Sequence, residues 1–159
     1  HFFGLLARKL PLVGRLTVRS ACATLCRTLS LLLASGLTLT ESLDLAAGNM
    51  NNIYFKEAAR AIRNMVTEGW TLNRSIQETR LFPPLVSNLV GVGEESGDLQ
   101  NMLSKLADYY DEEVEEATQR MLAWMEPILI IFMAFFVVAI VFSIFLPMVN
   151  MTQAFDSYL

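Results

Sequence analysis

Histidine is almost absent from this sequence, and that absence argues against the commonest catalytic bases and metal ligands. The 159 residues include one histidine, His1, at the first position. A Ser–His or Cys–His nucleophile needs a histidine held against it, and zinc sites usually use histidine as well. We therefore expect a protein that is not an enzyme and that carries no cofactor.

Cysteine is also scarce, which argues against a zinc site. Cys22 and Cys26 are the only two cysteines, and their spacing places both on one face of a predicted helix. A structural zinc site needs four ligands, and no histidine or second cysteine pair lies near these two. The pattern favours two small core-facing thiols in a reducing compartment.

Lysine and arginine are absent from the last part of the chain. All 12 precede Pro127, and the 23 residues from Pro127 to Val149 carry no charge. A helix of that length is about 35 Å long, which is enough to cross a hydrocarbon core of about 30 Å. We predict a transmembrane helix over residues 125–149. The positive-inside rule then places the preceding part in the cytoplasm and residues 150–159 outside.

The uneven distribution of charge bears on the possible partners. Residues 1–80 carry ten basic and five acidic groups, whereas residues 81–159 carry two and eleven. An acidic chain without a clustered basic face is not typical of nucleic-acid binding, so we expect no nucleic acid partner. Residues 1–16 mix basic with apolar side chains, which favours a membrane-proximal segment near anionic membrane lipid; a solvated linker fits the same composition.

The first residues also bear on processing. They lack the apolar stretch and the small-residue cleavage site of a signal peptide, and they include no initiator methionine. We therefore expect this sequence to be part of a longer protein.

The spacing of apolar residues predicts an all-α fold. Steps of three and four, interrupted by glycine and proline, indicate about six antiparallel helices over residues 17–124, the last of which continues into the transmembrane helix. The first helix should start near Val18, because Pro11 and Gly14 argue against a helix before it. No stretch predicts a strand. The residues expected in the core are Leu25, Leu29, Ile62, Leu89, Leu103 and Leu106.

Capping residues, prolines and glycines predict where these helices begin and end. Thr38 and Glu41 fit a capping box at the start of the second helix. Pro83 and Pro84 suit the first turn of the fifth helix, where a missing N–H group costs nothing. Gly97 is expected to close that helix with a positive φ angle.

The glycine-rich segment Gly91-Val92-Gly93-Glu94-Glu95-Ser96-Gly97 resembles a phosphate-binding loop only superficially. It lacks the lysine and the serine or threonine that follow the last glycine of a P-loop, and its two carboxylates would repel phosphate. Glu94, Glu95 and Asp98 are candidates for a calcium site, because Ca²⁺ binds carboxylate oxygens. They are weak candidates, because Ca²⁺ takes six to eight oxygen ligands and three carboxylates supply too few. Roles in helix packing, capping and surface charge are the simpler interpretation.

The predicted sixth helix has two unlike faces. Its apolar stripe runs from Leu99 to Trp124 and reaches an expected kink at Pro127, and its exposed end suits a seam between copies of the chain. On the other side lie carboxylates that are candidates for docking a basic partner: Asp111, Glu112, Glu115 and Glu116. The alternative is that these carboxylates merely solvate an exposed helix.

Several short motifs follow one another along the chain. They are Leu31–Leu43 (LLLASGLTLTESL), Leu81-Phe82-Pro83-Pro84, Gly93-Glu94-Glu95-Ser96-Gly97, Glu126-Pro127 and Leu146-Pro147. Each motif is weak alone, but together they cover nearly the whole sequence. In this order and spacing the chain resembles the C-terminal half of the inner-membrane platform proteins of type II secretion and type IV pilus assembly, the PilC/GspF family.

This resemblance implies a location, partners and a function. The family as known contains two helical domains and three membrane spans, so the chain looks like the second repeat without the first. The resemblance implies a non-enzymatic platform in the bacterial inner membrane that links a cytoplasmic assembly ATPase to pilin or pseudopilin subunits. Other inner-membrane assembly proteins and further copies of the chain are the remaining expected partners. A tail-anchored helical adaptor or sensor unrelated to pilus assembly is the alternative.

Overall fold

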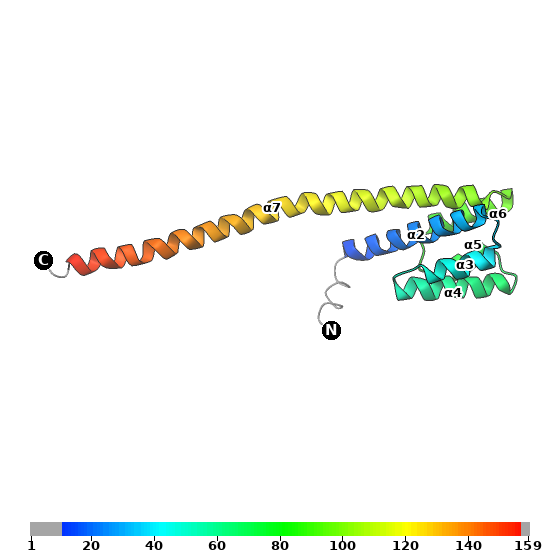
Figure 1. Ribbon diagram of the computed structural model, residues 1–159, viewed down its shortest axis with the longest axis horizontal. Helices are drawn as coiled ribbons and strands as arrows, with labels where there is room; N and C mark the ends of the chain where they lie inside the picture. The colour runs from blue at the N-terminus through cyan, green and yellow to red at the C-terminus, as the bar shows by residue number, and fades with distance from the viewer. Residues whose placement is uncertain (1–10, 157–159) are drawn as a thin grey trace. The chain divides into compact units, whose positions relative to one another are not determined.

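The computed structural model describes residues 11–156, and every regular element in that range is a helix. The helices are α2 (Pro11–Ala34), α3 (Leu39–Gly48), α4 (Ile53–Thr67), α5 (Leu72–Thr79), α6 (Pro84–Ser96) and α7 (Leu99–Asp156) (Figure 1). The all-α prediction is therefore confirmed for the described range. Most of the basic segment predicted over residues 1–16 lies outside it, as do residues 157–159.

The chain divides into two units, and the first of them is a helical bundle. It comprises α2 to α6 together with the part of α7 that ends at Ala117. The second unit begins at Thr118 and contains the remainder of α7. Trp124, which we expected to close the bundle, lies in this second unit.

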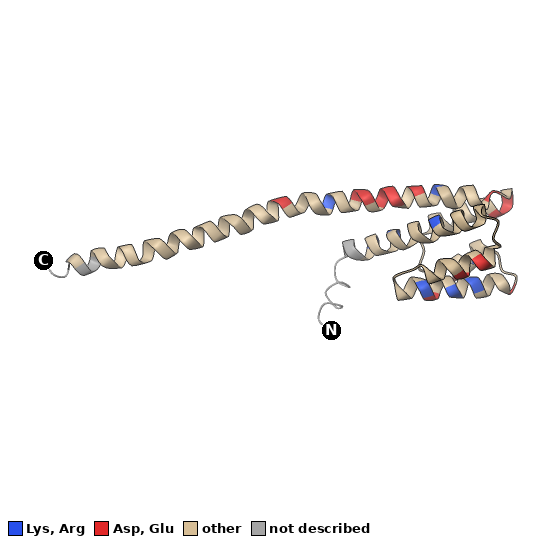
Figure 2. Cartoon of the chain, in the orientation of Figure 1, with Lys and Arg blue, Asp and Glu red and all other residues tan. Residues whose placement is uncertain are grey.

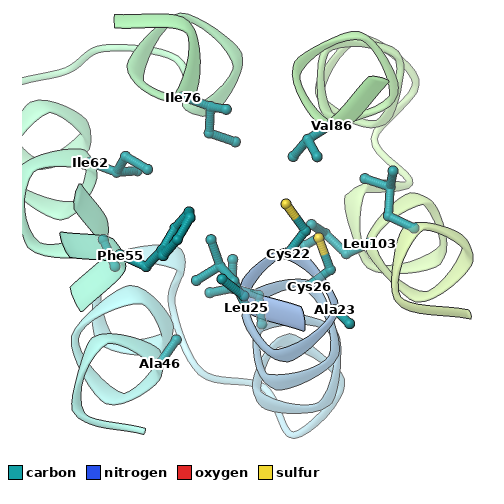
Figure 3. Packing of buried hydrophobic residues seen from close by; sticks show 14 of the residues in the cluster. Cys22, Ala23, Leu25, Cys26, Ala46, Phe55, Ile62, Ile76, Val86 and Leu103 are labelled. Carbon is teal, nitrogen blue, oxygen red and sulfur yellow. The ribbon is translucent and has the colours of Figure 1, made fainter. Parts of the chain in front are cut away.

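Helix α2 provides much of the core of the first unit. Figure 3 shows its side chains Cys22, Leu25 and Cys26 facing side chains from α4, α5, α6 and α7. Burying an aliphatic side chain of this size contributes about 1.5 to 3 kcal/mol, so this packing is a main source of stability. Five of the predicted core residues are at most 2% exposed, namely Leu25, Leu29, Ile62, Leu103 and Leu106.

Leu89 was predicted to lie in the core, but it is less buried than the other predicted core residues. Its side chain is only partly buried and packs against the edge of the core. The buried face of α6 is formed instead by Val86 and Val90, on either side of Leu89 along the chain. A helical period alone predicts which residues share a face, but not how deeply each edge of that face is covered.

Helix α2 begins earlier than the sequence predicted. It starts at Pro11 rather than near Val18, and Gly14 lies within it. Proline is well suited to a first helical turn, and one glycine in a helix costs only about 1 kcal/mol, so neither residue breaks the helix. Although α2 is long and apolar enough to span a membrane, Cys22 and Leu29 lie inside the bundle and mark it as a core helix.

The predicted capping box, the prolines at the start of α6 and the turn at Gly97 are confirmed. The side chain of Thr38 accepts a hydrogen bond from the backbone N–H of Glu41 at 3.3 Å. The Glu41 carboxylate accepts one from the backbone N–H of Thr38 at 3.1 Å. Pro84 is the first residue of α6, with Pro83 immediately before it. Gly97 follows α6 with a φ of 73°, a left-handed conformation that favours glycine.

Helix α7 is the longest element and continues from the bundle into the apolar segment. It has 58 residues and passes through Pro127 and Pro147 without ending. Its stretch Leu99–Thr152 is long and apolar enough to cross a membrane, and none of the most apolar part is buried by the protein. The prediction that the last helix of the bundle continues into a membrane-spanning helix is thus confirmed at the level of the fold.

Candidate functional site

Glu94, in the last turn of α6, uses its carboxylate to cap a different helix. The backbone N–H of Leu72 donates to Oε2 of Glu94 at 2.9 Å, and the N–H of Asn73 donates to Oε1 at 2.6 Å. The hydroxyl of Thr71 accepts a hydrogen bond from the backbone N–H of Arg74 at 3.3 Å. Three amides at the start of α5 are therefore satisfied, and the carboxylate lies at the positive end of the helix dipole.

This arrangement gives no support to a cation site. Both oxygens of Glu94 already accept a hydrogen bond, while Glu95 and Asp98 are exposed. Among the described residues the structure brings together no group of three histidine, cysteine, aspartate or glutamate side chains that would hold a metal. Helix capping, which the sequence favoured for this segment, accounts for Glu94, but the helix that it caps is α5.

The glycines of the same segment allow close helix packing. A Cβ atom added to Gly93 would lie 2.9 Å from the Cα of Leu99 and 3.1 Å from the Cβ of Met102. A Cβ atom added to Gly91 would lie 2.7 Å from the side-chain nitrogen of Asn73. The segment from Gly91 to Gly97 is therefore a junction at which α6 meets the start of α5 and the start of α7.

The Leu81-Phe82-Pro83-Pro84 motif attaches the start of α6 to the bundle. The ring of Phe82 packs edge-on against Phe55 of α4, with ring centroids 5.6 Å apart. This geometry is a favourable aromatic arrangement. Phe82 thus holds the turn before α6 against α4, and Pro83 and Pro84 begin the helix from that point.

Two arginines of α2 pair with carboxylates of α7. Nη2 of Arg27 lies 2.6 Å from Asp108 and 2.8 Å from Asp111, and Nη1 of Arg19 lies 3.0 Å from Glu113. The pairing order shows that α2 and this part of α7 run antiparallel. The hydrogen bonds that Arg27 donates to Asp111 and to Asp108 raise the pKa of its guanidinium above the ordinary value, so the group keeps its charge.

This pairing changes the interpretation of the acidic face of α7, which Figure 2 shows as a run of acidic residues. Asp111, which the sequence suggested as a docking residue, is exposed but forms an ion pair with Arg27. Glu112, Glu115 and Glu116 are exposed, and Glu116 makes a further interaction of its own. Glu112 and Glu115 remain the clearest candidates for contact with a basic partner.

The two thiols of α2 are unsuited to nucleophilic chemistry. Both cysteines are free and buried, as expected from the sequence. Burial raises the pKa of Cys22 to about 12, and burial, with a smaller contribution from Cys22, raises the pKa of Cys26 still further. Because the thiolate is the reactive form, neither side chain is a nucleophile near neutral pH.

The remaining motif residues lie in the second unit. Glu126 is exposed, and Pro127 and Pro147 are both inside α7. A proline within a helix removes one backbone hydrogen bond, so these are two points at which α7 is weakened without ending. The kink expected at Pro127 stays a prediction.

Comparison with known proteins identifies the family. The family described as "Type II secretion system (T2SS), protein F" matches residues 25–147, from within α2 to the apolar part of α7. The chain belongs to this family. The matched residues include the junction at Gly91–Gly97 and most of the uncharged stretch that begins at Pro127.

Individual relatives carry names from two related systems. The chain is 42% identical over 141 residues to "Type IV pilus assembly protein PilC" of Thermus thermophilus, covering 88% of this chain and 35% of the relative. The corresponding values for PilC of Pseudomonas aeruginosa are 39% over 139 residues, 87% and 37%. "Type II secretion system protein F" of Aeromonas hydrophila is 34% identical over 145 residues, with coverage of 91% and 37%. The chain thus spans about a third of the length of the curated relatives it matches.

Proposed function

We propose that this chain is part of a non-enzymatic platform in the bacterial inner membrane that supports assembly of a type IV pilus or a type II secretion pseudopilus. Its family and the names of its relatives, which refer to pilus assembly and to type II secretion, support this role. The platform links a cytoplasmic assembly ATPase with pilin-like subunits in the membrane. It works with other inner-membrane assembly proteins and with further copies of itself.

The observation that carries the proposal is the continuity of α7. One helix includes both the core residues Leu103 and Leu106 and the uncharged stretch that begins at Pro127. Because no loop interrupts α7, a displacement of its packed part passes along the helix backbone to the uncharged stretch. A partner that moves the bundle therefore acts on the membrane segment through this helix.

The described side chains also agree with a structural role. The buried thiols are neutral, the Glu94 carboxylate is used for capping, and the acidic groups of α7 include three that pair with arginines of α2. Each of these polar features is accounted for by packing, capping or ion pairing within the first unit. We accordingly place the function in binding and in the transmission of movement.

The topology of the proposal has the bundle in the cytoplasm and residues 150–159 on the other side of the membrane. A reporter enzyme that is active only outside the cytoplasm, fused after Leu159, should be active in cells. The same reporter inserted after Gly48, in the turn between α3 and α4, should be inactive. The opposite pattern would show that the orientation is reversed.

Complementation and co-purification test the function itself. Deletion of the gene that encodes the chain should abolish pili or pseudopilus-dependent secretion, and the intact gene should restore them. The tagged protein, solubilised in mild detergent, should carry the assembly ATPase and a pilin or pseudopilin with it. Normal assembly in the deletion strain, with neither partner recovered, would contradict the proposal and leave an unrelated membrane adaptor, which no observation here favours.

A further inference from the structure

The apolar stripe of α7 continues beyond the bundle that buries it. Leu103, Leu106 and Tyr110 are at most 4% exposed within the first unit. The same helical period continues into the second unit at Met121 and Trp124, which are 53% and 71% exposed. The stripe therefore extends past the protein that covers its first half.

The exposed end of this stripe belongs to a short segment with a distinctive composition. Within residues 121–125, Leu122 and Met125 are also 59% and 62% exposed. The segment is preceded by Arg120 and followed by Glu126, after which the uncharged stretch starts at Pro127. Four large apolar side chains thus lie at or just before the start of the predicted membrane span, ahead of the uncharged stretch, and form one continuous surface with that stretch.

We propose that residues 121–125 form an interfacial collar that lies in the lipid headgroup layer of the bilayer that α7 crosses. Five helical residues extend about 7 Å, and each headgroup layer is about 5 to 8 Å thick. If the hydrocarbon core begins at Pro127, the collar occupies that layer on the side of the bundle. Its partner is the phospholipid interface.

Trp124 is the residue best suited to this position. Tryptophan is enriched at both membrane–water interfaces, because its ring is apolar while its indole N–H still needs a hydrogen-bond partner. Glycerol and headgroup oxygens supply such partners, and hydrocarbon does not. Arg120 lies one helical turn before Trp124, where a basic side chain is favourable next to lipid phosphate.

The collar sets the depth at which the helix is held. An interfacial tryptophan disfavours movement of the helix into the hydrocarbon core or out into water, so it fixes the axial position of the span. The inference depends on the membrane span of α7 and not on the platform role. Its test needs no assembly partner, so its failure would leave the proposed function untouched.

The two tryptophans of the chain make a matched experiment possible. Trp70 lies in the bundle, where the guanidinium of Arg74 is 4.5 Å from its ring centre. The variant Trp70→Tyr keeps an aromatic face for Arg74 and leaves Trp124 as the single tryptophan. The variant Trp124→Phe leaves Trp70 and is the control. Both full-length variants are reconstituted in phosphatidylcholine–phosphatidylglycerol vesicles, and their helix content is compared with that of the parent by circular dichroism.

Fluorescence quenching by brominated phospholipids then measures the depth of each tryptophan. We expect Trp124 to lose more fluorescence to lipids brominated near the headgroup than to lipids brominated near the end of the acyl chain. We expect Trp70 to be insensitive to both lipids and to be quenched by aqueous iodide. Stronger quenching of Trp124 by the deep bromine would place it in the hydrocarbon core and overturn the proposal. Insensitivity of Trp124 to both lipids, whether in water or covered by a second copy, would overturn it as well.

Discussion

Oε1 of Glu94 lies 2.6 Å from the backbone nitrogen of Asn73. This contact joins the last turn of α6 to the first turn of α5. The two segments are also close at Gly91, where an added Cβ atom would lie 2.7 Å from the side-chain nitrogen of Asn73. The acidic segment Gly91–Gly97, which the sequence suggested as a weak candidate for a cation site, is therefore a junction between helices. Its carboxylate replaces the water that would otherwise solvate the start of α5.

Removal of this carboxylate should destabilise the bundle. Glu94→Ala leaves two amides of α5 without a charged acceptor and should lower the free energy of unfolding by about 1 to 3 kcal/mol. Glu94→Gln keeps an acceptor but loses the charge at the helix end, so about 1 kcal/mol is expected. Thermal unfolding in detergent measures both. Glu95→Gln, at an exposed neighbour, is the control, and an equal effect of the Glu94 and Glu95 variants would refute the capping role.

The close packing at Gly93 gives a second prediction. An alanine Cβ there would lie 2.9 Å from the backbone of Leu99, so α7 must shift to admit it. Gly93→Ala should cost about 1 to 3 kcal/mol, the usual effect of overpacking. Gly48→Ala meets nothing within 4 Å and should be neutral or stabilise by about 0.5 to 1 kcal/mol. Unchanged stability of Gly93→Ala would mean that the helices are not tightly packed at this junction.

Features with a local cause were predictable from the sequence. The Thr38–Glu41 capping box, the prolines that start α6 and the turn at Gly97 each depend on residues within one or two helical turns. The burial of Leu103 follows from the helical period of α7. For this reason these three helix ends and most of the core agree with the structure, whereas the start of α2 does not.

Features that depend on distant partners were not predictable. Glu94 binds the amide of a residue 22 positions earlier, and Arg27 pairs with a carboxylate 81 positions later. The sequence does not show which carboxylates of α7 pair with arginines of α2, because that depends on how the two helices pack. The missing information in both cases was the packing of α5 and α2 against the later helices.

The capping box at α3 should make stability depend on pH. Hydrogen bonds from the backbone and then the side chain of Thr38 lower the pKa of Glu41 below its ordinary value. A lowered folded-state pKa means that this stabilisation is complete above the ordinary pKa and is lost as the pH falls through the folded-state value. The parent should unfold at a higher temperature than Glu41→Gln near neutral pH, and the difference should disappear in acid. A difference that persists at low pH would show that the charge of Glu41 is not its cause.

The remaining exposed carboxylates of α7 should affect partner binding more than folding. The double variant Glu112→Lys, Glu115→Lys reverses two exposed charges and should leave the unfolding temperature close to that of the parent, because isolated surface charges contribute little. If these side chains dock a basic partner, the variant should lose pili or secretion while still inserting into the membrane. Association with that partner should also weaken as salt is added.

Asp111 supplies the matched control for this experiment. Asp111→Asn removes one of two carboxylates that bind Arg27, so it should lower stability by up to about 1 kcal/mol and leave assembly intact. Assembly that survives reversal of Glu112 and Glu115 would show that these residues only solvate the helix.

The central proposal is that α7 couples the bundle to the membrane segment through an unbroken helix. It is tested most directly by inserting seven residues between Ala117 and Thr118, where the two units meet. A helical insert of alanine, glutamate and lysine preserves the helix and rotates its faces by only about 20°. A glycine–serine insert of the same length interrupts the helix. With both proteins in the membrane at the parental level, measured piliation or secretion should persist with the helical insert and be lost with the flexible one; equal assembly by the two would contradict the account.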